Sequence, residues 1–310
     1  MKKINRQGIE GSFMGNLHTH TEFSDGSSPP ENYIEEAEKL GFSVLGFSDH
    51  SPVPFPNTFA IPEGGLPAYV EAITTLMTPP SLPLKGRSKS PSGDLGVNPE
   101  YGIQILLGLE YDYIPGLTAS VRNLREEYQF DYIIGSVHLV RNSHPDLLWF
   151  IDGPKVKTYD KGLRDVFGGD IRKAVTAYWR QLQEMIVQEQ PDIIGHLDKI
   201  KMHNHDRYFR EDEPWYVALT EETLELIRQK GSVVEVNTRG IYKQRSDTLF
   251  PGPELLKKIL ARRIPITLTS DAHKPEELSL FFPEAKEVLK SIGFNSLWTL
   301  TSGGWAETAI

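Results

Sequence analysis

Six of seven short apolar segments along this 310-residue chain are followed within a few residues by histidine or acidic side chains. Imidazole and carboxylate groups are ligands of divalent metal ions. The chain has no cysteine, so thiolate ligands and thiolate catalysis are excluded. Histidine, aspartate and glutamate together make up only about one residue in six, so such a regular placement is not expected by chance. The candidate metal ligands are His18, His20, Asp25, His50, Glu110, His138, His196, Asp271 and His273.

The spacing of two pairs supports metal binding. His18 and His20 are two residues apart, as are Asp271 and His273. Residues two apart on an extended segment point to the same side, so each pair can contact one ion. An ion has about four to six contacts including water, so nine ligands predict two or three divalent ions. Only three of the nine are carboxylates, and three such ions would therefore leave a positive charge that attracts a phosphate dianion.

These side chains must be positioned by the strands that precede them. Apolar segments that alternate with helical stretches predict βα units around a parallel sheet, in an α/β fold. Seven such units favour a closed barrel over an open doubly wound sheet, with the metal site where the C-terminal strand ends meet. The predicted strands are Phe13–Leu17, Val44–Phe47, Ile103–Leu109, Tyr132–Gly135, Asp192–Gly195, Val233–Val236 and Ile264–Leu268, with a weak eighth segment at Leu297–Leu300.

Seven stretches have the apolar periodicity of amphipathic helices. In the first of them, Ile34, Ala37 and Leu40 form one apolar stripe. The predicted helices are Glu31–Leu40, Leu66–Met77, Ala119–Glu127, Ile171–Glu189, Thr220–Lys230, Pro253–Ala261 and Pro283–Ser291.

Two long insertions, at about 78–102 and 141–170, interrupt a single domain that is expected to span residues 1–310. The first is rich in proline and serine and predicts a variable surface segment. The second mixes aromatic and basic residues and follows a predicted strand, where active-site loops belong. It is predicted to be a substrate lid.

Composition excludes several classes of partner. With 33 Lys and Arg against 42 Asp and Glu, the net charge is -9, so we expect no nucleic-acid track. The N-terminus lacks the apolar segment of a signal peptide, and no run approaches the ~18 apolar residues of a membrane span. We expect a cytoplasmic protein without a membrane segment. The oligomeric state is not predicted.

Seven motifs, in this order, resemble those of the polymerase and histidinol phosphatase (PHP) superfamily, and the resemblance spans residues 16 to 273. The stretch 235–240 and the form of the third motif are most similar to the stand-alone histidinol-phosphate phosphatases of histidine biosynthesis. The motifs are His18-x-His20, Ser24-Asp25-Gly26, Asp49-His50-Ser51-Pro52, Gly108-Leu109-Glu110, Gly135-Ser136-Val137-His138, Gly195-His196-Leu197-Asp198 and Ser270-Asp271-Ala272-His273.

The resemblance implies a distorted (β/α)7 TIM-like barrel with a trinuclear site. It also implies hydrolysis of L-histidinol phosphate to L-histidinol and phosphate, by attack of a metal-bridging hydroxide on phosphorus. The metals of this family vary among zinc, manganese and iron, and these nitrogen and oxygen ligands do not decide between them. The implied ligand sets are His18, His20, Glu110 and Asp271 for one ion, Glu110, His138 and His196 for a second, and Asp25, His50 and His273 for the third.

Catalytic roles are expected for Asp271, Glu110, His273 and Asp198. Asp271 can bind metal and also accept the proton of the attacking water. Asp198 is expected to orient His196 or a neighbouring ligand.

Substrate contacts are less strongly indicated. Lys161, Arg164 and Arg239 are candidate phosphate clamps, although solvated surface charge explains each of them equally well. A clamp at Arg164 would mean that its replacement by alanine raises KM or lowers kcat. Trp149 either contacts the substrate or packs within the lid. Glu235 and Asn237, at the end of the sixth strand, either fill the barrel or contact substrate.

Two alternative functions remain open from the sequence. A different PHP phosphoesterase would act on nucleotides or other small phosphate esters, and turnover of nucleoside monophosphates would reveal it. A non-catalytic metal-binding module would hold metal without turnover, but the presence of all nine ligands disfavours it.

Overall fold

The computed structural model describes residues 14–77, 102–142, 147–301 and 303–310. The predicted insertion at about 78–102 lies almost entirely outside the described residues. So does Phe13, the first residue of the first predicted strand.

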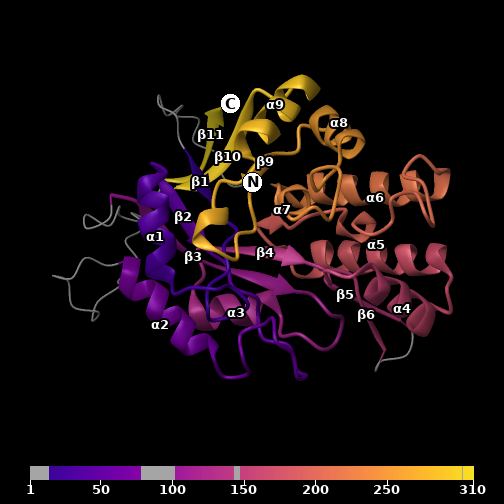
Figure 1. Ribbon diagram of the computed structural model, residues 1–310, viewed down its shortest axis with the longest axis horizontal. Coiled ribbons are helices and arrows are strands. Elements are labelled where there is room, and N and C mark those ends of the chain that lie inside the picture. The colour runs from indigo at the N-terminus through magenta and orange to yellow at the C-terminus, as the bar shows by residue number, and fades with distance from the viewer. Residues whose placement is uncertain (1–13, 78–101, 143–146, 302) are drawn as a thin grey trace.

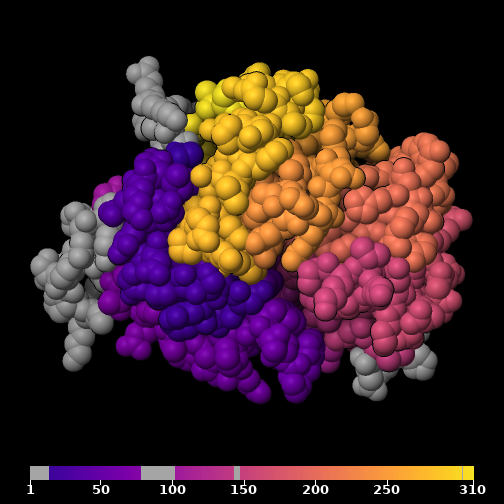
Figure 2. Space-filling model, in the orientation of Figure 1, coloured from indigo at the N-terminus to yellow at the C-terminus, as the bar shows by residue number. Residues whose placement is uncertain are grey.

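A parallel seven-stranded sheet forms the centre of the fold (Figure 1). The first and last strands are joined beyond their ends, because Ala272 exchanges backbone hydrogen bonds with His18 (3.1 Å) and His20 (2.8 Å). The N-terminal segments accordingly lie directly against the C-terminal ones (Figure 2). The sheet is thus a nearly closed barrel, which confirms the predicted fold class. In spatial order its strands are β1 (Gly15–Asn16), β2 (Val44–Phe47), β3 (Gln104–Asp112), β4 (Tyr132–Ser136), β7 (Ile193–Ile194), β8 (Val233–Asn237) and β9 (Ile266–Thr269).

Helices surround the barrel and bury their apolar stripes against it (Figure 1). Two of them begin at a side-chain cap: Ser120 accepts a hydrogen bond from the Asn123 N–H, and Asp170 accepts one from the Lys173 N–H. The helices are α1 (Pro30–Lys39), α2 (Leu66–Met77), α3 (Val121–Tyr128), α4 (Val156–Phe167), α5 (Ile171–Gln188), α6 (Pro214–Lys230), α7 (Arg239–Tyr242), α8 (Pro253–Ala261) and α9 (Phe282–Ile292), with short 3₁₀ turns η1 (Lys199–Lys201) and η2 (Pro275–Glu277).

An apolar cluster inside the barrel includes Leu17, Leu106, Ile134 and the ring of Tyr132. The Tyr132 hydroxyl crosses the barrel and donates a hydrogen bond to the Leu17 carbonyl (2.5 Å). Two neighbouring strands make room for this ring with glycine. A Cβ at Gly46 would lie 2.2 Å from the Tyr132 hydroxyl, and one at Gly108 would lie 2.3 Å from the ring.

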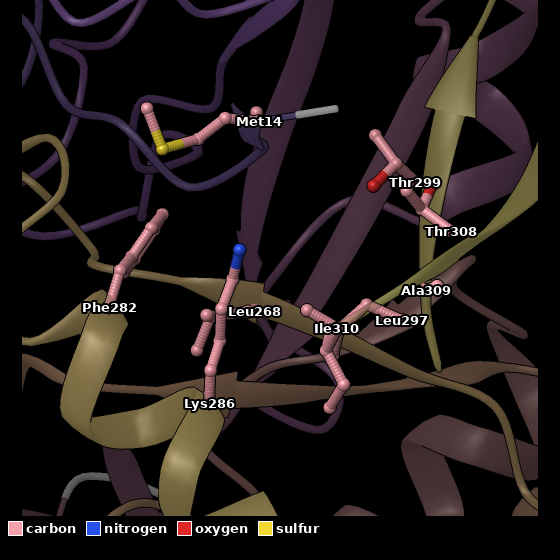
Figure 3. Close-up of a pocket in the computed structure, with 10 residues that line it drawn as sticks. Met14, Leu268, Phe282, Lys286, Leu297, Thr299, Thr308, Ala309 and Ile310 are labelled. Carbon is pink, nitrogen blue, oxygen red and sulfur yellow. The ribbon is translucent and has the colours of Figure 1, made fainter. Parts of the chain in front are cut away.

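The weak eighth strand predicted at Leu297–Leu300 does exist, but outside the barrel. It belongs to β10 (Ser296–Thr301), which pairs with β11 (Gly304–Ala309) as an antiparallel hairpin. Leu300 joins the apolar cluster inside the barrel, so the hairpin covers that cluster from below. A cavity of about 20 Å³, room for roughly one water molecule, remains beside the hairpin, and the Lys286 ammonium points into it (Figure 3).

The predicted lid is largely regular structure within the described residues. A short hairpin, β5 (Leu139–Arg141) and β6 (Leu148–Phe150), leads into α4. The buried face of α4 includes Tyr159, Leu163 and Phe167, spaced four residues apart as on one side of a helix. This helix was missed because its many charged residues were interpreted as a loop. No helix in the described part of the chain is long and apolar enough to span a membrane.

We expect Gly108→Ala to lower the free energy of unfolding by about 1–3 kcal/mol, because the added methyl group overpacks the barrel interior against Tyr132. Urea unfolding would measure the loss. In a Tyr132→Leu background the ring is absent, so the same substitution should cost clearly less. An equal cost in both backgrounds would contradict this packing explanation.

Candidate metal centre

All nine candidate ligands meet at the C-terminal ends of the barrel strands. Three sets of side chains each offer one ligand atom per residue within 4.8 Å of one another. His196 completes the centre, with Nε2 lying 3.1 Å from Glu110 Oε1 and 3.0 Å from His138 Nε2. The three sets are His20, Asp25, His50 and His273; His18, His20 and Asp271; and His50, Glu110 and His138.

The loop after β1 is shaped by a carboxylate that points away from the cluster. Asp49 accepts hydrogen bonds from the backbone N–H groups of Thr21 (2.8 Å) and Ser24 (3.1 Å) and from the Ser24 hydroxyl (2.6 Å). These bonds fold the loop back so that Asp25 reaches His273, with Oδ1 3.1 Å from Nε2. Asp49 therefore positions the candidate ligand Asp25 through the backbone of the loop.

Glu110 occupies the middle of the centre. It lies inside β3, and its side chain is 1% exposed. Its Oε1 accepts a hydrogen bond from the Ser136 hydroxyl (2.6 Å), which fixes the carboxylate. Two imidazoles from the segment after β1 approach Oε2: His18 Nε2 at 3.2 Å and His20 Nε2 at 3.4 Å. A carboxylate surrounded in this way is placed to bridge two ions.

Asp271 lies opposite Glu110, across His18 and His20. Its Oδ1 is 3.4 Å from His20 Nε2, and its Oδ2 accepts a hydrogen bond from the Asn237 amide (3.2 Å). The backbone of Asp271 is left-handed, with φ of 52°, a conformation that aspartate tolerates better than most residues. Arg239 holds this turn by donating to the Asp271 carbonyl (2.6 Å).

Buried nitrogen atoms without hydrogen-bond partners show that these residues fit a metal ion. His18 Nε2, both ring nitrogens of His20, and His196 Nδ1 have no partner in the described structure. A buried polar atom left unpaired is costly, and such atoms in native proteins require an explanation. The unpaired Nε2 atoms of His18 and His20 face carboxylate oxygens at 3.2–3.8 Å. An ion between them would satisfy both nitrogens.

The buried carboxylates remain ionised despite their burial. Burial by itself raises the pKa of Glu110 and of Asp271. The positive field of His18 acts on both groups, aided by His50 at Glu110 and by Arg239 at Asp271, and it holds each pKa well below its usual range. Both groups are therefore available as charged ligands at neutral pH.

Two histidines of the centre differ sharply in basicity. Burial and the nearby positive charges of His273 and His50 lower the pKa of His20 to about 3, so this imidazole is neutral and ready to ligate. Burial also opposes the charge on His50, but Glu110 and Asp112 outweigh it and raise the pKa of His50 to about 10. In the metal-free protein His50 is therefore protonated, and metal binding displaces a proton.

Two carboxylates behind the centre orient its histidines. Glu235 accepts from His18 Nδ1, and Asp112 accepts from His50 Nδ1 (2.8 Å) and from His138 Nδ1. Asp112 was missed because the predicted third strand ended at Leu109, whereas β3 continues to Asp112. The alternation of a strand places Asp112 on the same face as Glu110, so a longer strand would have revealed it.

A buried ion pair also adjoins the centre. The Lys199 ammonium, on a side chain that is 2% exposed, lies 2.9 Å from Asp152 Oδ1 and 3.9 Å from Asp271 Oδ2. Asp152 comes from the predicted lid, and its Oδ2 lies 3.8 Å from His138 Nε2. Nothing in the local sequence distinguished either residue from other charged loop residues.

Asp198 does not orient His196 in this structure. Its Oδ2 instead accepts hydrogen bonds from the Lys201 ammonium (2.7 Å) and the Gly252 N–H (2.9 Å). It thereby connects η1 to the start of α8. The reason is directional: Asp198 begins a helical turn after His196, so the two side chains do not share a face.

Of the four predicted substrate contacts, only Arg239 lies at the centre. Trp149 is fully buried within the lid, where its Nε1 donates to the Tyr159 carbonyl (3.0 Å). Lys161 and Arg164 are 70% and 69% exposed, and both pair with Asp165 on the same helix. Within the described residues, no hydrogen bond or ion pair joins these two cations to the metal ligands.

Comparison with known families gives one clear match. The model of the PHP domain matches residues 16–239 of this chain, which is more than two thirds of its length. The matched segment includes the first seven of the nine candidate ligands.

Curated relatives have related names. A protein of Deinococcus radiodurans named a probable histidinol-phosphatase is 28% identical over 280 residues, which cover 89% of this chain and 92% of the relative. The histidinol-phosphatase of Bacillus subtilis is 24% identical over 273 residues, covering 83% of this chain and 92% of the relative.

A solved structure shares the fold. The histidinol phosphate phosphatase of Lactococcus lactis, crystallised with zinc, L-histidinol and phosphate, superposes with a TM-score of 0.63 at 20% identity. The match covers 94% of this chain and 98% of the other.

The raised pKa of His50 predicts how the stability of the metal-free protein depends on pH. Its folded-state pKa of about 10 exceeds the unfolded value of about 6.5. The resulting stabilisation is complete below pH 6.5 and is lost as pH rises through 10. Urea unfolding of chelator-treated protein should therefore show a falling free energy of unfolding between pH 7 and 10.

The variant His50→Gln should flatten that fall, because it removes one of the groups that release a proton. His205→Gln is the control, since His205 is 47% exposed and lies outside the cluster. A slope in His50→Gln as steep as that of the unsubstituted protein would contradict the assignment.

Proposed function

The chain belongs to the PHP domain family, and we propose that it is a metal-dependent phosphomonoesterase that hydrolyses L-histidinol phosphate to L-histidinol and phosphate. The observation that carries this proposal is the convergence of nine metal-binding side chains on one barrel mouth, with buried imidazole nitrogens left unpaired. The choice of substrate is supported by the names of the relatives and by the ligands of the Lactococcus lactis structure.

Three divalent ions would be shared among the nine residues. The centre would take zinc, manganese or iron, since nitrogen and oxygen ligands suit all three. We propose His18, His20, Glu110 and Asp271 for the first ion, Glu110, His138 and His196 for the second, and Asp25, His50 and His273 for the third.

When bound, such ions lower the pKa of water toward ~7 and neutralise charge on phosphate oxygens. The side chains of the protein do the remaining work. Asp271 is ionised and held by Asn237 and Arg239, so its carboxylate can accept the proton of the attacking water. The new bond joins that water oxygen to phosphorus, and the ester P–O bond breaks. The leaving alkoxide takes up a proton from solvent water, and Asp271 releases the proton that it accepted to solvent.

Fixed positive charge beside Asp271 favours phosphate. The Lys199 ammonium is buried, with 2% of its side chain exposed, and the Arg239 guanidinium is largely buried, with 11% exposed. Cations held in a water-poor site stabilise developing negative charge more strongly than mobile surface cations do. Glu110 and His273 contribute as ligands, and Asp198 contributes by holding Lys201 and the backbone at Gly252.

Aromatic side chains beside the centre are suited to the organic part of the ester. Phe59 stands edge-on to His50, with ring centroids 5.5 Å apart, and stacks against Phe150 of β6 at 6.0 Å. Both phenylalanine rings are only partly buried. Such a surface offers a flat imidazole an apolar and polarisable contact.

The function is tested by phosphate release from L-histidinol phosphate, p-nitrophenyl phosphate and a panel of nucleoside monophosphates, with the manganese- or zinc-loaded protein. We expect kcat/KM of ~10⁴ M⁻¹s⁻¹ or more for L-histidinol phosphate, well above the others, and loss of turnover with a chelator. Faster turnover of mononucleotides would identify a different PHP phosphoesterase. Bound metal without any turnover would indicate a non-catalytic module.

The candidate phosphate contacts can be separated by a matched pair of variants. Arg239→Ala should lower kcat/KM by at least about tenfold, because it removes a largely buried cation and the donor that holds the Asp271 backbone. Arg164→Ala should leave kcat/KM within about twofold, because Arg164 is exposed and paired with Asp165. A large loss in Arg164→Ala would restore the clamp suggested by the sequence. Steady-state kinetics with L-histidinol phosphate measures both.

A further inference from the structure

One carboxylate at the end of β3 contacts two metal-binding histidines at once. Asp112 Oδ2 accepts a hydrogen bond from His50 Nδ1 (2.8 Å), and Asp112 Oδ1 accepts one from His138 Nδ1. The residue is 1% exposed, and its backbone N–H donates to the Ser51 hydroxyl (3.1 Å). Both oxygens of a single buried side chain are thus committed to imidazoles.

The remaining nitrogens of these histidines face different parts of the centre. His50 Nε2 lies 3.9 Å from Asp25 Oδ1, on the side of His273. His138 Nε2 lies 3.6 Å from Glu110 Oε1 and 3.0 Å from His196 Nε2. His50 Nδ1 is also 3.1 Å from Glu110 Oε2, but Asp112 is the closer acceptor. Asp112 therefore stands behind ligands of two different ions of the proposed centre.

A neutral imidazole carries its proton on one nitrogen and binds metal through the other. An acceptor at Nδ1 holds the proton there and leaves Nε2 free to bind. Glu235 does this for a single histidine, His18, and uses its other oxygen for the His196 backbone N–H. Within the described structure, Asp112 is the carboxylate that accepts from the Nδ1 atoms of two candidate ligands, His50 and His138.

We propose that Asp112 is a positioning residue that sets the tautomer of both His50 and His138 and so links the occupancy of two metal positions. The inference rests on the metal centre proposed above and adds a prediction about how its ions are lost. Removing Asp112 should weaken two ions together, whereas removing either histidine should weaken one.

The two obvious variants should differ in a way that mere structural damage would not produce. Asp112→Ala removes both acceptors, and two ions should bind about 10–100-fold more weakly. Asp112→Asn has the same shape but only one acceptor oxygen. The NH₂ group of the asparagine would donate a hydrogen bond to the Nδ1 atom of the other histidine. That histidine would then carry its proton on Nε2, so Nε2 could not bind metal. One ion should be weakened and the other retained.

The experiment measures tightly bound zinc per chain after dialysis against a weak chelator, and the absorption spectrum during cobalt(II) titration. His50→Gln and His138→Gln provide the single-ion reference. Asp112→Asn should match one of them, and Asp112→Ala should lose more metal than either. Equal metal loss in Asp112→Ala and Asp112→Asn, or metal content in both equal to the unsubstituted protein, would overturn the proposal.

Asp192→Asn is the matched control, because Asp192 lies before β7, and so at the opposite end of the barrel from the ligands. Its Oδ2 accepts from the Ile133 N–H (2.8 Å) and pairs with Arg125. This variant should keep the full metal content. If circular dichroism shows that Asp112→Ala is unfolded, Asp112→Leu replaces it. Fewer than two ions on the unsubstituted protein would overturn the metal centre itself, which separates that failure from failure of the role of Asp112.

Discussion

The structure depends on keeping charged groups inside the barrel where water cannot reach them. Glu110 is 1% exposed, and an isolated carboxylate at such a site would be neutralised rather than buried in its charged form. Imidazoles from four other segments surround it, and the positive field of three of them, His18, His50 and His138, keeps it ionised. Removing one partner of such a group leaves a buried charge uncompensated, which is strongly unfavourable. The ligands and their orienting carboxylates therefore form one interdependent set.

The barrel meets this constraint by separating its interior into two layers. The lower layer is apolar and is filled by Tyr132 and its neighbours, with Leu300 of the C-terminal hairpin closing it from below. The upper layer holds the charged cluster. Successive side chains along β3 and β8 point to opposite faces of the sheet. Glu110 and Glu235 therefore point inward to the charged cluster, while Leu109 and Val236 pack against the helices outside. The same strands thus build the outer core and orient the candidate metal ligands.

Strand ends and residue type were sufficient to predict from the sequence that the nine candidate ligands meet, because the carboxyl ends of parallel strands must converge. The orienting carboxylates were harder to predict. Asp112 lies three residues beyond the predicted end of its strand, and its role becomes evident only when the structure places His50 and His138 on either side of it. Burial could not be inferred for charged residues: Lys199 is 2% exposed and Lys161 is 70% exposed, although both occupy lysine-containing segments after a strand. The start of α6 at Pro214, before the predicted Thr220, follows from proline in the first turn.

Charged groups beyond the nine candidate ligands also change the net charge at the mouth of the barrel. Three further carboxylates, Asp112, Asp152 and Glu235, join the three carboxylate ligands, and two cations, Lys199 and Arg239, lie beside them. These described groups together carry four negative charges when the histidines are neutral. Three divalent ions would reverse this to two positive charges, which matches the charge of a phosphate monoester dianion. Because the two fixed cations lie next to Asp271, that positive charge would be greatest on the side from which water is proposed to attack phosphorus. The orienting carboxylates therefore limit the attraction for anions, which favours release of the phosphate product.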